Sequence, residues 1–177
     1  SLAMTKDFIE PTSIKILDYL NEALQTIQGI EGQDVRRANC RMGIGNYYNN
    51  IGDTDTALAH FKQAAETFEQ NYRLASMGNC YSNMGSCYLK MNDLANGEKY
   101  LEKALDLRMK FGSPDELCIS YFNMAVLNRQ KEDFLLCEEY LYKALKIAEE
   151  TGNKRMVARI NDKLNELTQA KRQLKAA

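Results

Sequence analysis

The sequence has few of the residues that interrupt regular structure or carry common chemistry. Only two of its 177 residues are proline, and histidine occurs once, as His60. No apolar run approaches the roughly 20 residues that a membrane-spanning helix needs, and no signal-peptide pattern is present at the N-terminus. The formal net charge of −1 gives no overall attraction to nucleic acid or to an anionic membrane. We therefore expect a folded cytoplasmic protein that binds neither.

Motifs for catalysis are also missing. We find no phosphate-binding loop, nucleophile elbow or metal-ligand spacing. The five cysteines form no Cys-x-x-Cys pair, and their odd number fits free thiols in a reducing compartment. We interpret them as small buried residues, with metal or redox chemistry as the alternative, and His60 as a surface or interface residue. The sequence thus predicts no enzymatic activity, catalytic residue, cofactor or metal.

What the sequence does contain is a repeated segment. Residues 100–105 read YLEKAL, and residues 140–145 read YLYKAL, 40 positions later. A further copy, YLNEAL at 19–24, precedes 100–105 by 81 positions, or about two periods, and residues 60–65, HFKQAA, fill the gap. The chain therefore has an internal period of 40 residues.

Each period predicts two amphipathic helices, because large and small apolar residues recur at steps of three and four. Asp53, Asp93 and Asp133 each precede a new helical pattern, where a carboxylate can accept from free backbone N–H groups. The stretch from Gly112 to Glu116 predicts a left-handed helix end at the glycine, followed by a capping box. No strand-like alternation of useful length is present, so we expect an all-α fold.

The order of residues within each period resembles the tetratricopeptide repeat, in which a Leu-Gly-x-x-Tyr helix precedes an Ala-x-x-x-Phe-x-x-Ala helix. The matching residues are Ile44, Gly45, Tyr48, Ala57, Phe61 and Ala64; Met84, Gly85, Tyr88, Gly97, Leu101 and Ala104; and Met124, Ala125, Cys137, Leu141 and Ala144. The chain departs from the pattern at Arg41 and Asn128, and its period exceeds the usual 34 residues. It is therefore similar to the long-repeat type found in Pins and kinesin light chain scaffolds and in bacterial peptide-pheromone receptors.

The resemblance implies a right-handed α-solenoid of antiparallel helix pairs, which bury their apolar faces only by stacking. We expect the chain to divide into a tail at 1–11, a helix of a degenerate repeat at 12–30, full repeats at 33–70, 71–112 and 113–151, and a capping helix at 153–175.

The resemblance also implies a concave wall formed by the first helix of each pair. Asn83 and Asn123 hold equivalent positions that face this groove in the family, and an asparagine amide can both donate to and accept from a peptide backbone. The alternative is that these amides are solvated or bond to a neighbouring helix. The full set of predicted groove residues is Asn46, Asn49, Asn50, Asn83, Asn123, Arg129, Tyr47 and Phe122.

The first helices are also more basic than the second. They contain seven Lys or Arg against three Asp or Glu, whereas the second helices contain seven against ten. This favours an acidic peptide or a C-terminal carboxylate as the ligand, unless a residue such as Arg41 packs inside its own unit. The carboxylate clamp of chaperone-binding relatives is not expected, because the corresponding positions lack its cationic residues.

Two functions follow from these patterns. The first is a non-catalytic scaffold that binds a protein or an extended peptide segment in the groove. The alternative is a sensory or regulatory module of a larger bacterial kinase, cyclase or transcription regulator. In that case Val157, Ile160, Leu164, Leu167 and Leu174 would form a coiled coil or homodimer seam within residues 153–175. The sequence names neither the partner nor the oligomeric state.

Overall fold

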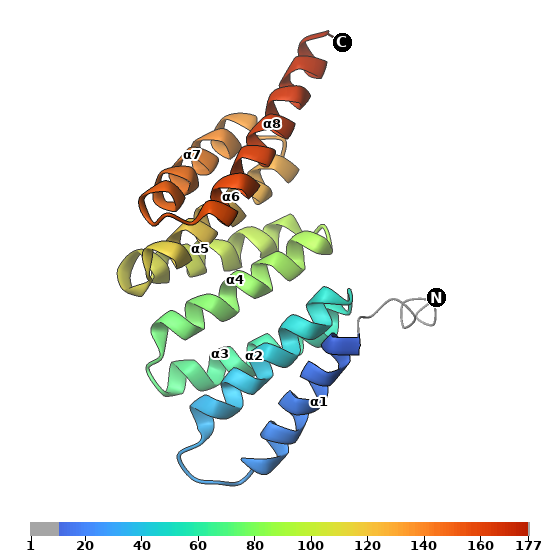
Figure 1. Cartoon of the computed structure of the whole chain (residues 1–177), viewed down its shortest axis with the longest axis vertical. Helices are drawn as coiled ribbons and strands as arrows, with labels where there is room; N and C mark the ends of the chain where they lie inside the picture. Colours follow the sequence, from blue (N-terminus) through green and yellow to red (C-terminus); the bar gives the residue numbers. More distant parts are fainter. Residues whose placement is uncertain (1–10, 177) are drawn as a thin grey trace.

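The computed structural model describes residues 11–176, and this part of the chain is a stack of eight antiparallel helices without strands (Figure 1). The predicted tail at 1–11 lies outside the described residues except for Pro11. The helices are α1 (Pro11–Thr26), α2 (Asp34–Asn50), α3 (Thr54–Gln70), α4 (Leu74–Lys90), α5 (Leu94–Phe111), α6 (Pro114–Gln130), α7 (Phe134–Glu150) and α8 (Lys154–Ala176). The first residues of α2, α4, α6 and α8 are each 40 positions apart, as the sequence period requires.

The predicted caps hold the starts of the helices. Asp53, Asp93 and Asp133 accept hydrogen bonds from backbone N–H groups three residues further on, at 3.1, 3.1 and 3.0 Å. Ser113 and Glu116 form the complete capping box, with Pro114 as the first helical residue of α6. These bonds satisfy N–H groups that have no partner within the helix.

One expectation about the turns was wrong. Gly112 is not left-handed but extended, with φ −86° and ψ 162°, because the chain runs directly into the extended cap residue Ser113. The other turns of the repeat do contain a left-handed residue. Three of these are not glycine: Tyr72, Asn92 and Glu132, with φ of 54°, 59° and 61°.

Small residues in the first helices let the second helices approach closely. A Cβ atom placed on Gly45 would lie 2.7 Å from the ring of Phe61, and one on Gly85 would lie 2.6 Å from Cγ of Leu101. Both large side chains are almost fully buried. The close approach is therefore built from a glycine on one helix and a large apolar residue on its partner.

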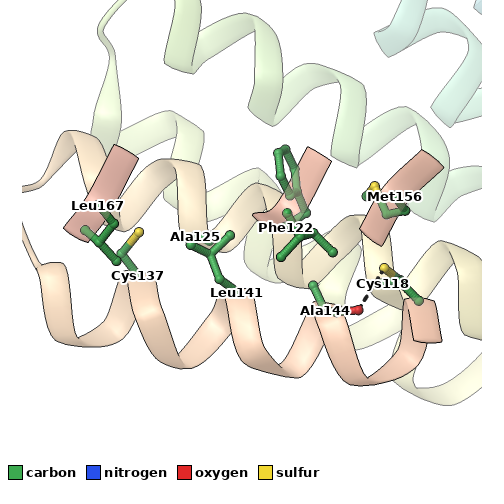
Figure 2. Packing of buried hydrophobic residues seen from close by; sticks show 10 residues of the cluster. Cys118, Phe122, Ala125, Cys137, Leu141, Ala144, Met156 and Leu167 are labelled. Atoms are coloured by element: carbon green, nitrogen blue, oxygen red, sulfur yellow. Dashed lines mark hydrogen bonds between the residues drawn. The ribbon is translucent and has the colours of Figure 1, made fainter. Parts of the chain in front are cut away.

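The two end helices pack on the neighbouring units. Leu20 of α1 lies against Gly43 of α2, where an added Cβ would be 2.9 Å from its Cδ1. Met156, Ile160 and Leu167 of α8 join the buried cluster of α6 and α7 around Phe122 and Leu141. Figure 2 shows Met156 and Leu167 at opposite ends of this cluster.

The outer face of α8 is polar. Asn165 occupies the position that Gly45, Gly85 and Ala125 hold in the other first helices, and it is exposed. Lys171, near the end of α8, pairs with Glu138 of α7 at 2.6 Å. A polar outer face is what a terminal helix of a repeat stack needs. The division into repeats and the role of 153–175 as a cap, rather than as a dimer seam, remain predictions.

Candidate ligand-binding groove

The first helices of the pairs line the inner side of the stack. The central helix α4 contacts α3 and α5, and it also contacts α2 and α6, the first helices on either side of it. Helices on the inside of a curved stack lie closer together than those on the outside. We therefore describe α2, α4 and α6 as the wall of the candidate groove.

Two of the predicted groove asparagines bond to each other. Nδ2 of Asn83 on α4 donates to Oδ1 of Asn46 on α2 at 2.9 Å. Asn46 is exposed and Asn83 half-buried. An amide group offers two N–H donors and an oxygen with two lone pairs, so each side chain keeps hydrogen-bonding capacity for a ligand.

The next pair along α2 and α4 joins an asparagine to a lysine. Nζ of Lys90 donates to Oδ1 of Asn49 at 2.7 Å and to its backbone oxygen at 2.9 Å. Asn50 follows as the exposed last residue of α2. The charge of Lys90 is thus held at the end of α2.

Asn123 on α6 also reaches a neighbouring helix. Its Nδ2 donates to Oγ of Ser82 on α4 at 3.0 Å. Asn83 and Asn123 therefore both bond to the preceding first helix, which is the alternative that the sequence left open. Their remaining donors and acceptors are what a ligand could use.

A buried polar network lies behind Asn123, and the sequence reasoning missed it. Arg108 of α5 is only 5% exposed. Its Nη1 donates to Ser120 at 2.9 Å and to Ser82 at 3.3 Å, and its Nη2 donates to Oδ1 of Asn79 at 2.8 Å. Burial lowers the pKa of Arg108, and the nearby Glu116 carboxylate opposes this. The signal was available in the repeat, because Phe68 and Ala148 hold the position of Arg108 one period away on either side.

The remaining predicted residues are placed less favourably. Phe122 is 2% exposed and lies in the buried cluster under α8, with the guanidinium of Arg159 4.3 Å from its ring centre. It therefore packs within the core instead of lining the groove, because α8 covers its side of α6. Tyr47 is half-buried, edge-on to the ring of Tyr48 at 5.4 Å.

Arg129 is exposed and stacks on Phe134 at 4.9 Å. Together with Val126, Cys137 and Lys163 it lines a cavity of about 200 Å³ between α6, α7 and α8. The arrangement brings an exposed cation next to an apolar recess at one end of the wall.

Several cations of the first helices are already bonded to other residues of the chain. Arg37 donates to the backbone oxygens of Ile27 and Ile30, at 3.0 and 2.9 Å, and pairs with Asp34. Arg41 donates to Gln63 of α3 at 2.9 Å. Arg41 therefore packs inside its own repeat, which was the stated exception to the prediction of an acidic ligand. The basic character of the wall is therefore smaller than the residue count suggested.

The cysteines are arranged as structural residues. All five are free, and every one except Cys40 is buried. Burial raises the pKa of Cys80 to about 12 and that of Cys87 to about 11. In the described part of the chain, no group of three or more His, Cys, Asp or Glu is placed to hold a metal ion.

His60 stacks on Tyr48, with ring centres 5.9 Å apart. Burial, helped by the charge of Arg41, lowers the pKa of His60.

None of the helices described between residues 11 and 176 is long and apolar enough to cross a membrane.

Part of the chain matches a known family of repeats. Residues 76–150 match the model of the tetratricopeptide repeat. Response regulator aspartate phosphatase A of Bacillus subtilis is 31% identical over 125 residues, which is 66% of this chain and 31% of that protein.

Two solved structures show a similar fold. One is a Rap protein complexed with competence and sporulation factor, with a TM-score of 0.77 and 18% identity over 93% of this chain and 48% of that one. The other is a kinesin light chain from Podospora anserina with nearly identical repeats, with a TM-score of 0.65 and 12% identity over 99% and 91% of the two chains. The chain thus spans about a third of the curated relative and about half of the Rap structure.

Proposed function

We propose that this chain, which matches the tetratricopeptide repeat over residues 76–150, is a non-catalytic scaffold that binds a protein segment or an extended peptide along the wall formed by α2, α4 and α6. The observation that carries this proposal is the row of partly exposed amides that crosses the wall. Asn46, Asn83 and Asn123 come from three successive first helices, and each keeps donors or acceptors that its bond to a neighbour does not use.

The spacing of the row suits an extended ligand. Packed helices lie about 8–10 Å apart, and an extended chain rises about 3.3 Å per residue. Each first helix would therefore meet every third residue or so of a peptide. Amides that bond to backbone groups select an extended conformation rather than a particular sequence.

The Rap structure with competence and sporulation factor supports this type of ligand by analogy, because it has the same fold with a bound factor. That similarity extends over only about half of the Rap chain. We therefore carry over the class of ligand, a protein or peptide segment, and not its identity. An acidic segment fits best, because Arg73 is exposed at the beginning of α4.

A second candidate function is a regulatory module of a larger signalling protein. It is favoured by the 31% identity to part of a response regulator aspartate phosphatase. In this case the groove would still bind a protein segment, and the consequence of binding would pass to other parts of that protein. A phosphatase activity is not part of the proposal.

The proposal is tested by affinity capture from a lysate of the source cells. The wild-type chain is compared with the Asn83→Ala/Asn123→Ala variant and with a control, Asn161→Ala/Asn165→Ala, which removes two exposed amides from α8. Circular dichroism first establishes that all three are equally folded. A partner held by the wild type and the control but lost by the groove variant supports the proposal. Equal capture by all three would place binding outside the groove.

A further inference from the structure

The middle repeat differs from its neighbours in what lies behind the groove. In the first repeat, Met42, Phe68 and Cys80 pack together in one apolar cluster. The equivalent residues one period later are Ser82, Arg108 and Ser120, which are all buried. A guanidinium and two hydroxyl groups have therefore replaced an apolar cluster at the same place in the fold.

A buried guanidinium is normally less favourable for stability than an apolar cluster. A buried charge is normally paired with an opposite charge, and replacing a buried ion by apolar residues is often neutral or stabilising. Within residues 11–176, no carboxylate forms an ion pair with Arg108, although the Glu116 carboxylate is near enough to interact with its charge. Its hydrogen-bond partners are all neutral, and its Nε is buried without any partner.

The network connects this charge to the groove. Oγ of Ser82 accepts from Arg108 at 3.3 Å and from Nδ2 of Asn123 at 3.0 Å. Asn123 is half-buried on the wall, so it lies between the guanidinium and a ligand. Because an arginine side chain only donates, Ser82 accepts from Arg108. It also accepts from Asn123, whose amide nitrogen points toward Ser82.

We propose that Arg108 makes the groove above Asn123 selective for a carboxylate of the bound peptide, acting from behind the wall as a buried positive charge without an ion-pair partner. This inference rests on the proposed peptide-binding function and assigns its acidic preference to one residue. Arg108 is a positioning residue, because it is buried and acts through Ser82 and Asn123.

The size of the effect follows from Coulomb's law. A carboxylate that accepts the second N–H of Asn123 would lie about 9 Å from the guanidinium. With an effective dielectric constant of about 20–40, one charge at this distance changes the affinity about five- to twentyfold. The effect of a buried charge should persist at salt concentrations that screen exposed charges.

The experiment selects ligands for the wild-type chain from a phage-displayed library of random peptides. The best acidic peptide is then synthesised in two forms, one with its acidic residue and one with the corresponding amide. The affinity ratio of the two forms is measured for the wild type, for Arg108→Met and for Arg36→Gln. The last variant removes an exposed charge from α2 and changes the net charge equally.

We expect the wild type to prefer the acidic form about tenfold, Arg108→Met to bind both forms nearly equally, and Arg36→Gln to keep most of the preference. A merely structural role of Arg108 would weaken both forms together and leave their ratio unchanged. An unchanged ratio in Arg108→Met therefore overturns the inference. If Arg108→Met does not fold, the triple variant Ser82→Met/Arg108→Phe/Ser120→Cys, which copies the apolar cluster of the first repeat, takes its place.

Failure of the inference and failure of the proposed function are distinguishable. If the selection yields only neutral peptides whose binding is lost in Asn83→Ala/Asn123→Ala, the groove binds peptides but Arg108 does not select a carboxylate. If the wild type selects no peptide above background, the proposed function fails and the inference falls with it.

Discussion

The contact between Gly85 and Leu101 offers a sharp test of how the helix pairs are held together. Leu101 is 2% exposed, and a Cβ on Gly85 would lie 2.6 Å from its Cγ and 2.7 Å from its Cδ2. These distances are far too short for two carbon atoms, so Gly85→Ala must displace the leucine. We expect the overpacking to lower the free energy of unfolding by about 1–3 kcal/mol. The higher helix propensity of alanine should offset about 1 kcal/mol of this loss.

Leu101→Ala acts in the opposite direction, because it leaves a cavity beside Gly85. Truncation of a buried leucine costs about 2–5 kcal/mol. The new Cβ of Gly85→Ala would point into that cavity, so the double variant should be destabilised less than the sum of the two single variants. We expect the difference to be about 1 kcal/mol or more, within the range measured for residues in contact.

The assay is urea denaturation of the four proteins, followed by far-UV circular dichroism. A matched control is the equivalent truncation one period later, Leu141→Ala, combined with Gly85→Ala. Leu141 packs in a different cluster from Leu101, so these two changes should be additive. Additivity of Gly85→Ala and Leu101→Ala as well would refute the close-packing argument.

Three further outcomes are expected. Glu132→Gly should stabilise the fold by up to about 1 kcal/mol, because residue 132 is left-handed (φ 61°) and Gly52 holds the same turn position two periods earlier. Thermal or urea denaturation measures this change, and a loss of stability would contradict the prediction. Partial burial raises the pKa of Glu116, but hydrogen bonds from Ser113 and Asn79 and the charge of Arg108 outweigh it, so the pKa lies below its ordinary value of 4.5. Glu116 should therefore stabilise the fold fully above pH 4.5 and lose this contribution as the pH falls through the lowered pKa, whereas Glu116→Gln should show a flatter acid limb of stability. In the folded protein, iodoacetamide should modify Cys40 first, because the other four thiols are buried. Mass spectrometry detects the modified cysteines, and equal modification of all five would show that the core opens readily.

Much of the fold could be predicted from the sequence because it depends on local rules that recur. The aspartates at 53, 93 and 133 each cap a helix, as their position before an apolar pattern indicated. The 40-residue period located the helices because each unit repeats the same amphipathic pattern. The error at Gly112 arose because the extended cap at Ser113 follows it directly.

The site was harder to predict because it depends on contacts between units. The partner of Asn83 is Asn46, which lies 37 positions earlier, and no local pattern shows that two amides on adjacent helices meet. Phe122 was assigned to the groove from its type and position, but α8 covers it. Arg108 looked like an ordinary charge of a second helix. Only comparison with Phe68 and Ala148 marks its position as one that is buried in the other repeats.

The most direct test of the groove as the binding site is isothermal titration calorimetry. The ligand is the segment of the captured partner that binds this chain. It is titrated into the wild-type chain, the Asn83→Ala/Asn123→Ala variant and the α8 control Asn161→Ala/Asn165→Ala. We predict that the groove variant binds at least about tenfold more weakly, since it loses two ligand hydrogen bonds of roughly 1 kcal/mol each, and that the control binds as the wild type does. Equal affinities for all three proteins would contradict binding along α2, α4 and α6.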